Sequence, residues 1–218
     1  MKEFIKNNSL SIVFLVLFSA TLVAQTVFGH QEYNKELVEN GGTTVTVQQY
    51  LTSGHFVEST FENWESEFLQ MALFVVFTIF LKQKGSSESK KFDGTDDVDC
   101  KPDPNKKDAP WPVKKGGFVL KLYQNSLTIA LLLLFAISFV LHFYGSLADQ
   151  NVENKLKGEA LETTVNYIAD SRFWFESFQN WQSEFLSVFA IVALSIYLRQ
   201  QGSPQSKPVD APHYETGE

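Results

Sequence analysis

The chain reads Phe61-Glu62-Asn63-Trp64-Glu65-Ser66-Glu67-Phe68-Leu69, and 117 residues later it reads Phe178-Gln179-Asn180-Trp181-Gln182-Ser183-Glu184-Phe185-Leu186. Both stretches run directly into an apolar segment that carries no charge. The same offset matches Asn8-Ser9-Leu10 with Asn125-Ser126-Leu127 near the start of each copy. Because this period far exceeds that of a solenoid repeat, the pattern predicts one duplicated module rather than a repeat array.

Apolar residues are concentrated in four blocks, which are residues 10–28, 68–81, 122–144 and 185–198. The first block has no charged residue, and the only ionisable group of the third that titrates near neutral pH is His142. An uncharged run of about 18 or more residues is long enough to cross a bilayer as a helix. The two shorter blocks reach that length if their helices include part of the repeated stretch. The sequence therefore predicts an all-α membrane protein with four transmembrane helices, arranged as two tandem-duplicated helical hairpins.

The first apolar block also has an alternative interpretation as a signal peptide. Lys2 and Lys6 precede it, and Ala24 offers a cleavage position. However, its counterpart in the second copy, residues 127–144, lies in the middle of the chain, where a leader cannot be cleaved. An uncleaved helix is therefore favoured.

The predicted domain organisation follows the repeat and the composition. Residues 1–84 form a first two-helix membrane module, and residues 118–201 form a second. Between them, residues 85–117 are rich in Lys, Asp, Ser, Pro and Gly, which predicts a disordered cytoplasmic linker. Residues 202–218 are predicted to be a flexible cytoplasmic tail.

The loop charges predict the orientation in the membrane. Only four of the 18 Lys and Arg residues lie in segments 30–67 and 147–184, namely Lys35, Lys155, Lys157 and Arg172. Because Lys and Arg are enriched on the cytoplasmic side, both termini and the linker are expected to be cytoplasmic. An even number of helices in each copy gives both copies the same orientation, as in parallel-repeat membrane proteins.

Local features place the second helix of each module. Ser53 and Asp170 occupy matched positions and are good N-cap residues, so these helices are expected to start near Gly54 and Ser171. The first of them is expected to extend to about Gln83. Residues 43–47 are rich in β-branched side chains, which favours a short strand or an extended loop before that helix.

The repeated stretch places a carboxylate at a shallow depth in each copy. Glu67 precedes Lys82 by 15 residues, and Glu184 precedes Arg199 by the same number. That separation is about 22 Å along a helix, against a hydrocarbon core of about 30 Å. Carboxylates inside a membrane often mark ion or proton pathways, and two close carboxylates favour sharing one proton. The candidate ion or proton site consists of Glu67, Glu184, Asn63, Asn180, Ser66 and Ser183.

An architectural interpretation of the same residues is favoured over that site. The long side chains of Lys82 and Arg199 can snorkel, which would shift both helices outward until the glutamates reach the headgroups. Tryptophans would then anchor the helices and the linker at the membrane interfaces. These candidate anchors are Trp64, Trp181, Trp174 and Trp111.

Several function classes are disfavoured. A net charge of −7 without a basic cluster outside the linker argues against nucleic-acid binding. No Gly-rich phosphate loop, metalloprotease motif or nucleophile elbow occurs, so no enzyme activity and no cofactor are expected. Cys100 is the only cysteine and cannot form an intramolecular disulfide. No metal site is expected, because the second copy has Leu147 and Arg172 where the first has His30 and His55.

The region from Gly54-His55-Phe56 through Phe61 to Met71 resembles a family of bacterial multi-pass membrane proteins known only as a domain of unknown function. The C-terminal Gly202-Ser203-Pro204, Ser206-Lys207-Pro208 and Ala211-Pro212-His213 are also similar to that family. The resemblance implies a bacterial inner-membrane location and no particular activity.

The sequence thus predicts a non-enzymatic inner-membrane protein that acts by assembly or partner contacts. Its expected partners are the lipid bilayer and a second copy of the chain or another membrane protein. The first alternative is a cation- or proton-binding or translocating protein that uses Glu67 and Glu184. The second alternative is a lipid-binding module.

Overall fold

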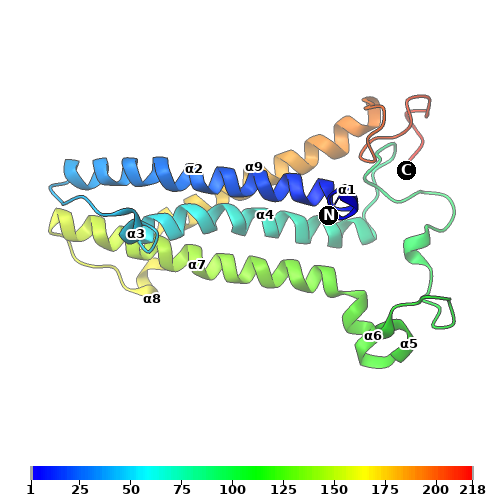
Figure 1. Ribbon diagram of the computed structural model, residues 1–218, viewed down its shortest axis with the longest axis horizontal. Coiled ribbons are helices and arrows are strands. Elements are labelled where there is room, and N and C mark those ends of the chain that lie inside the picture. Colours follow the sequence, from blue (N-terminus) through cyan, green and yellow to red (C-terminus); the bar gives the residue numbers. More distant parts are fainter. Residues whose placement is uncertain (1, 218) are drawn as a thin grey trace. The chain divides into compact units, whose positions relative to one another are not determined.

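The structure, a computed structural model, describes residues 2–217, which contain helices, turns and loops but no strand (Figure 1). The elements in chain order are α1 (Lys2–Asn7), α2 (Ser9–Glu39), α3 (Val47–Tyr50), α4 (Gly54–Phe80), the 3-10 helix η1 (Asp97–Asp99), α5 (Trp111–Lys115), α6 (Gly117–Gln124), α7 (Ser126–Lys157), α8 (Thr164–Tyr167) and α9 (Ser171–Tyr197). The prediction of an all-helical fold is confirmed for the described residues.

The chain forms two compact units. The first unit contains residues 1–61 and 140–174, and the second contains residues 62–139 and 175–218. The first unit therefore combines α1, α2, α3, α8, the C-terminal part of α7 and the N-terminal ends of α4 and α9. Each unit takes residues from both of the predicted modules.

Two helices of the described range are long and apolar enough to cross a membrane, α2 and α7. The apolar 18-residue segment of α2 has no buried residue, whereas the core helix of a soluble protein is mostly buried. The prediction that α4 and α9 also cross the membrane stays a prediction.

The predicted starts of the second helices are confirmed. α4 begins at Gly54, and the Ser53 hydroxyl accepts a 3.2 Å hydrogen bond from the N–H of Phe56. α9 begins at Ser171, and an Asp170 carboxylate oxygen accepts a 2.7 Å hydrogen bond from the N–H of Arg172. These bonds satisfy amide groups that lack a partner in the first turn of a helix.

The end of α4 differs from the expected Gln83, because the helix stops at Phe80. Beyond it, the N–H of Gln83 donates to the Ser89 hydroxyl at 2.9 Å, so a side chain replaces the helical carbonyl as acceptor. The N–H of Gln200 donates to the Ser206 hydroxyl at the same distance after α9.

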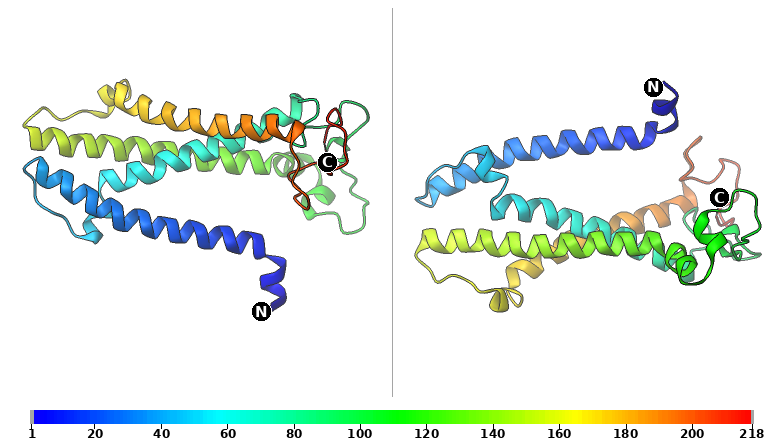
Figure 2. Two further views of the ribbon diagram at one scale, coloured as in Figure 1. Left: turned by 90° about the horizontal axis from the view of Figure 1, so that it is seen from above. Right: turned by 60° about the horizontal axis from the view of Figure 1, so that its bottom comes forward.

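Of the two alternatives for residues 43–47, the structure has the loop: residues 43–46 form no strand, and Val47 begins α3. The loop backbone is satisfied by one side chain of α2: Asn34 accepts from the Val45 N–H at 2.6 Å and donates to the Val45 carbonyl at 3.1 Å. Asn151 of α7 makes the same pair of bonds with Glu162, at 2.7 and 3.1 Å. Each long helix thus holds the loop that follows it through one asparagine. Figure 2 shows the paths of both loops, from α2 to α3 and from α7 to α8.

The helix bounds recur with the sequence offset. α3 and α8 span 47–50 and 164–167, and α4 and α9 span 54–80 and 171–197. Thr46 and Thr163 each accept a 3.3 Å hydrogen bond as N-caps of α3 and α8.

Two matched tyrosines are fully buried in the first unit. Tyr50 packs with Tyr33 and Leu37, while Tyr167 lies close to Phe173. The two environments differ where the tyrosine hydroxyl meets the long helix. Tyr167 shares a 2.6 Å hydrogen bond with the hydroxyl of Ser146, whereas the Tyr50 hydroxyl occupies the space that a Cβ on Gly29 would need.

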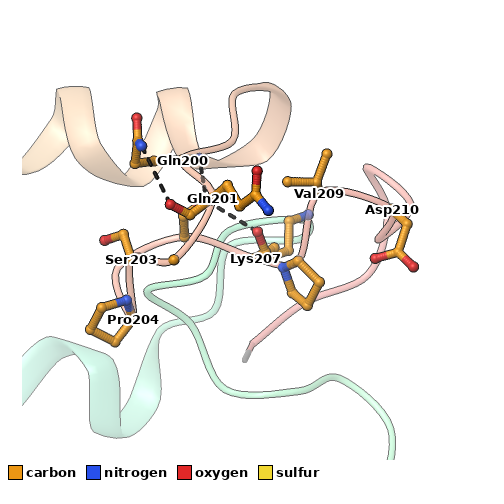
Figure 3. A pocket seen from close by; sticks show the side chains of 10 residues that line it. Gln200, Gln201, Ser203, Pro204, Lys207, Val209 and Asp210 are labelled. Carbon is orange, nitrogen blue, oxygen red and sulfur yellow. Dashed lines mark hydrogen bonds between the residues drawn. The ribbon is translucent and has the colours of Figure 1, made fainter.

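In the second unit, the start of the linker contacts the C-terminal tail. The Gly85 N–H donates to the Thr216 hydroxyl at 2.9 Å, and the hydroxyls of Ser86 and Ser195 lie 2.8 Å apart. The ammonium group of buried Lys207 donates to the carbonyls of Pro212, His213 and Glu215 in the tail. Figure 3 shows Lys207 among the residues that line a pocket between Gln200 and Asp210. Disorder of the rest of the linker and flexibility of the tail stay predictions.

Candidate functional site

The candidate site residues of the first copy lie on α4 in the second unit. Ser66 is buried, and its hydroxyl donates to the Asn63 carbonyl at 2.8 Å. Asn63 and Glu67 are exposed. Of the three candidate site residues on α4, Ser66 alone is therefore buried.

The matched residues of the second copy lie on α9. Ser183 is exposed, while Asn180 and Glu184 are half-buried. The side-chain amide of Asn180 donates to the Glu176 carbonyl at 3.0 Å. Glu67 and Glu184 both lie in the second unit, on α4 and α9.

The carboxylate that is fully buried on α4 is Glu65, which the sequence did not single out. The indole N–H of Trp181 donates to Glu65 Oε1 at 2.8 Å. Position 182, the counterpart of Glu65, is Gln182, and it is exposed. The repeated stretch therefore builds an unequal pair, in which the tryptophan of one copy binds the acid of the other.

The remaining predicted anchors have different environments. Trp174 is half-buried and donates its indole N–H to the Ile168 carbonyl at 2.8 Å, and Trp64 is also half-buried. Trp111 is exposed and lies under the ammonium group of Lys115. The interfacial roles of these tryptophans stay predictions.

A second polar cluster, which we call the Arg172 cluster, lies in the first unit. The guanidinium of Arg172 on α9 meets three carboxylates and one amide from two other helices. Its partners are Asp149 (2.9 Å), Glu153 (3.1 Å) and Gln150 (2.7 Å) on α7 and Glu58 (3.3 Å) on α4. The planar fork of an arginine suits several acceptors at once, which a lysine cannot reproduce.

The matched position on α4 carries His55, which faces acidic residues as well. Its Nε2 lies 3.9 Å from the Glu36 carboxylate on α2. The His55 ring packs at 4.9 Å from the ring of Tyr33. The cluster therefore connects α2, α4, α7 and α9 within one unit.

A cavity of about 250 Å³ opens beside the Arg172 cluster, between the C-terminal parts of α2 and α7. Its lining combines carboxylates, polar groups and apolar side chains, namely Tyr33, Glu36, Leu37, Asn40, Asp149, Val152, Glu153 and Leu156. Arg172 and Lys157 already engage two of its three carboxylates.

Two glycines let α4 and α7 approach at the cluster. A Cβ on Gly145 would lie 2.5 Å from the backbone nitrogen of Glu58, and one on Gly54 would meet the backbone at Asp149. Backbone atoms cannot move aside as a flexible side chain can. The glycines thus bring Glu58 and Asp149 to one guanidinium.

The cluster lies beyond the apolar stretches, which end at Phe28 and Tyr144. Burial raises the pKa of the Asp149 carboxyl above its ordinary value, although His55 and Arg172 oppose the shift. Burial, with the charges of Asp149 and Glu36, raises the pKa of Tyr33 to about 12. Burial and Glu36 also raise the pKa of Tyr50.

Within residues 2–217, no three His, Cys, Asp or Glu side chains converge so that they could hold a metal ion. The chemistry available at the Arg172 cluster is ion pairing and hydrogen bonding. With an arginine bound to three carboxylates, the arrangement holds helices together.

The sequence contained one indication of this cluster. Arg172 is one of only four strong bases in the segments predicted to face outward, and it replaces His55 of the first copy. Glu58 comes from the other module, and Asp149 and Glu153 belong to no recognisable motif, so sequence spacing could not identify these partners.

The fold and the Arg172 cluster define the class: an all-helical protein with two candidate membrane-spanning helices, in which one arginine binds carboxylates of two other helices. The chain belongs to a family described as a domain of unknown function (DUF6766), whose model matches residues 1–218. The resemblance to an uncharacterised family is thereby confirmed. No curated protein and no solved structure matches the chain.

Proposed function

We propose that the chain is a bacterial inner-membrane protein with four spans, whose termini and linker are cytoplasmic. Large apolar side chains exposed along α2, α7 and α9 support membrane contact, and examples are Phe14, Leu133 and Phe189. The scarcity of Lys and Arg in segments 30–67 and 147–184 supports the orientation. The Arg172 cluster then lies at the outer face.

We also propose that the protein arose by duplication of a two-helix module, residues 1–84 and 118–201. The matched bounds of α4 and α9 and the matched loop contacts of Asn34 and Asn151 support this origin. Exact recurrence of such local contacts requires matched sequence at each contact, which shared membrane composition does not supply.

The protein acts without catalysis, through assembly with a second copy or with another membrane protein. The observation that carries this proposal is the Arg172 cluster, in which the guanidinium of a residue on α9 binds side chains of α4 and α7. A site that binds and releases ions needs ligands open to exchange. Here the buried carboxylates are held by an internal cation, which suits a fixed outer surface for partner contacts.

Native mass spectrometry of the detergent-solubilised chain tests the assembly. The proposal predicts a defined oligomer, or a stoichiometric membrane protein partner that co-purifies from the native host. A monomer that carries neither, at concentrations matching those in the membrane, would contradict it. A phospholipid retained in a fixed ratio would instead favour the lipid-binding alternative.

The cation- or proton-handling alternative is supported by the recurrence of Glu67 as Glu184, on α4 and α9 of the same unit. Its test is the thermal stability of the wild type and of Glu67→Gln/Glu184→Gln across pH and a panel of cations. A stability shift that only the wild type shows would establish ligand linkage to the carboxylates. Equal responses of the two proteins support the assembly role.

A further inference from the structure

The segment between the linker and α7 exposes large apolar side chains. It contains α5 and α6, which pack against each other in the second unit. Trp111 is 64% exposed, Phe118 79% and Leu122 50%. Because most of their surface is not covered by the second unit, these side chains are available to a partner.

The same segment is uniformly basic. Lys114, Lys115 and Lys121 are exposed, and the chain has no acidic residue between Asp108 and Asp149. The ammonium group of Lys115 lies 4.8 Å from the centre of the Trp111 ring, in a cation–π arrangement. A chain with a net charge of −7 therefore carries a local patch of the opposite sign.

The apolar and basic groups of α6 are arranged along one helix. At about 100° per residue, Phe118 and Leu122 project within about 40° of each other, whereas Tyr123 projects about 100° away from Leu122. Lys121 lies about 60° from Phe118, at the border of the face. This is the pattern of a helix that lies in a membrane interface.

A break separates α6 from α7. Asn125 leaves the helical conformation with ψ of 9°, and its side-chain amide donates to the Lys121 carbonyl at 2.8 Å. Asn8 makes the same 2.8 Å bond to Phe4 between α1 and α2. Because α6 does not continue the axis of α7, it can lie along a surface that α7 enters (Figure 1).

We propose that residues 110–124 form an interfacial segment that binds anionic phospholipid headgroups through Lys114, Lys115 and Lys121. Trp111, Phe118 and Leu122 insert at the level of the headgroups. Charge complementarity and continuity with the candidate membrane-spanning α7 identify the occupant as the lipid surface. This inference rests on the proposed insertion of α7 and adds the lipid class that the segment prefers.

The test is hydrogen–deuterium exchange of the full chain in nanodiscs of phosphatidylcholine alone and of phosphatidylcholine with phosphatidylglycerol. Each lysine near an anionic surface strengthens binding roughly fivefold, so three lysines give on the order of 100-fold. We expect the amides of α5 and α6 to exchange at least about tenfold more slowly in the anionic nanodiscs. K114Q/K115Q/K121Q should remove this slowing, whereas the matched linker variant K101Q/K106Q/K107Q should keep it.

Equal exchange of α5 and α6 in both lipids would overturn the inference, and so would equal loss of protection in the two triple variants. Amides of α7 serve as the internal reference for insertion. If α7 is strongly protected while α5 and α6 show no lipid dependence, the interfacial segment fails but the proposed insertion stands. If α7 itself exchanges freely, the membrane proposal fails.

Discussion

Replacing Arg172 by Met should be among the most destabilising single substitutions in the chain. It leaves two poorly exposed carboxylates without their cation, because the side chains of Asp149 and Glu58 are 8% and 12% exposed. Glu153 is 38% exposed and keeps Lys157 at 3.1 Å, so it contributes less. Breaking a buried ion pair by removal of one partner costs about 3–5 kcal/mol.

Thermal unfolding in detergent, followed by tryptophan fluorescence, measures this cost. For a chain of this size about 1 kcal/mol corresponds to about 2–4 °C, so Tm should fall by about 6–20 °C. Lys155→Met removes an exposed positive charge from α7 and is the matched control, with an expected change within about 0.5 kcal/mol. Arg172→Lys should recover only part of the loss, because one ammonium group cannot reach all four partners.

Adding Asp149→Asn to Arg172→Met should raise Tm again, since a buried amide costs less than an unpaired carboxylate. The reasoning is refuted if Arg172→Met costs less than about 1 kcal/mol, the range of an exposed ion pair. It is also refuted if Asp149→Asn lowers Tm further in the Arg172→Met background.

Three further predictions concern the first unit, and each is measured by the same thermal assay. Gly145→Ala should destabilise by about 1–3 kcal/mol, because its Cβ meets the α4 backbone, and a neutral effect would disprove the close approach. Asn34→Ala and Asn151→Ala should each lower the free energy of unfolding by about 1–3 kcal/mol, because each leaves a loop N–H and a loop carbonyl without their hydrogen-bond partner. Strongly unequal losses would show that the matched contacts differ in strength. Tyr33 has a pKa of about 12 in the fold, above the ordinary value of 10.0, so its stabilising effect is complete below pH 10 and is lost as the pH rises toward 12. Tyr33→Phe should make Tm depend less on pH over that alkaline range. Tyr214→Phe, at an exposed position, should leave the dependence of Tm on pH unchanged.

Local sequence was sufficient to predict the helix starts. Ser53 and Asp170 are N-caps, and their side chains act on amides two or three residues away, so neighbouring residues alone determine these bonds. The loop at 43–47 was less predictable. Its β-branched residues suit a strand, but the side chain of Asn34 supplies the hydrogen bonds that a neighbouring strand would have made.

The buried acid on α4 depended on information that spacing does not contain. Glu67 was favoured because it recurs as Glu184, whereas Glu65 has no acidic counterpart. Glu65 and Glu67 are two positions apart on α4, so their side chains project about 200° apart around the helix. The rotation of α4 about its axis therefore decides which of the two carboxylates is buried. That rotation follows from tertiary packing, including the bond from Trp181 to Glu65.

Cysteine labelling in intact cells tests the four-span architecture most directly. Cys100 is the only native cysteine and is exposed in the linker. Thr44→Cys and Leu161→Cys, in a Cys100→Ser background, place single thiols at matched, exposed loop positions. The four-span account predicts that an impermeant maleimide labels positions 44 and 161 in intact cells and Cys100 only after permeabilisation. If only α2 and α7 cross, Cys100 and position 44 will share one side and position 161 will lie on the other, and the account is wrong.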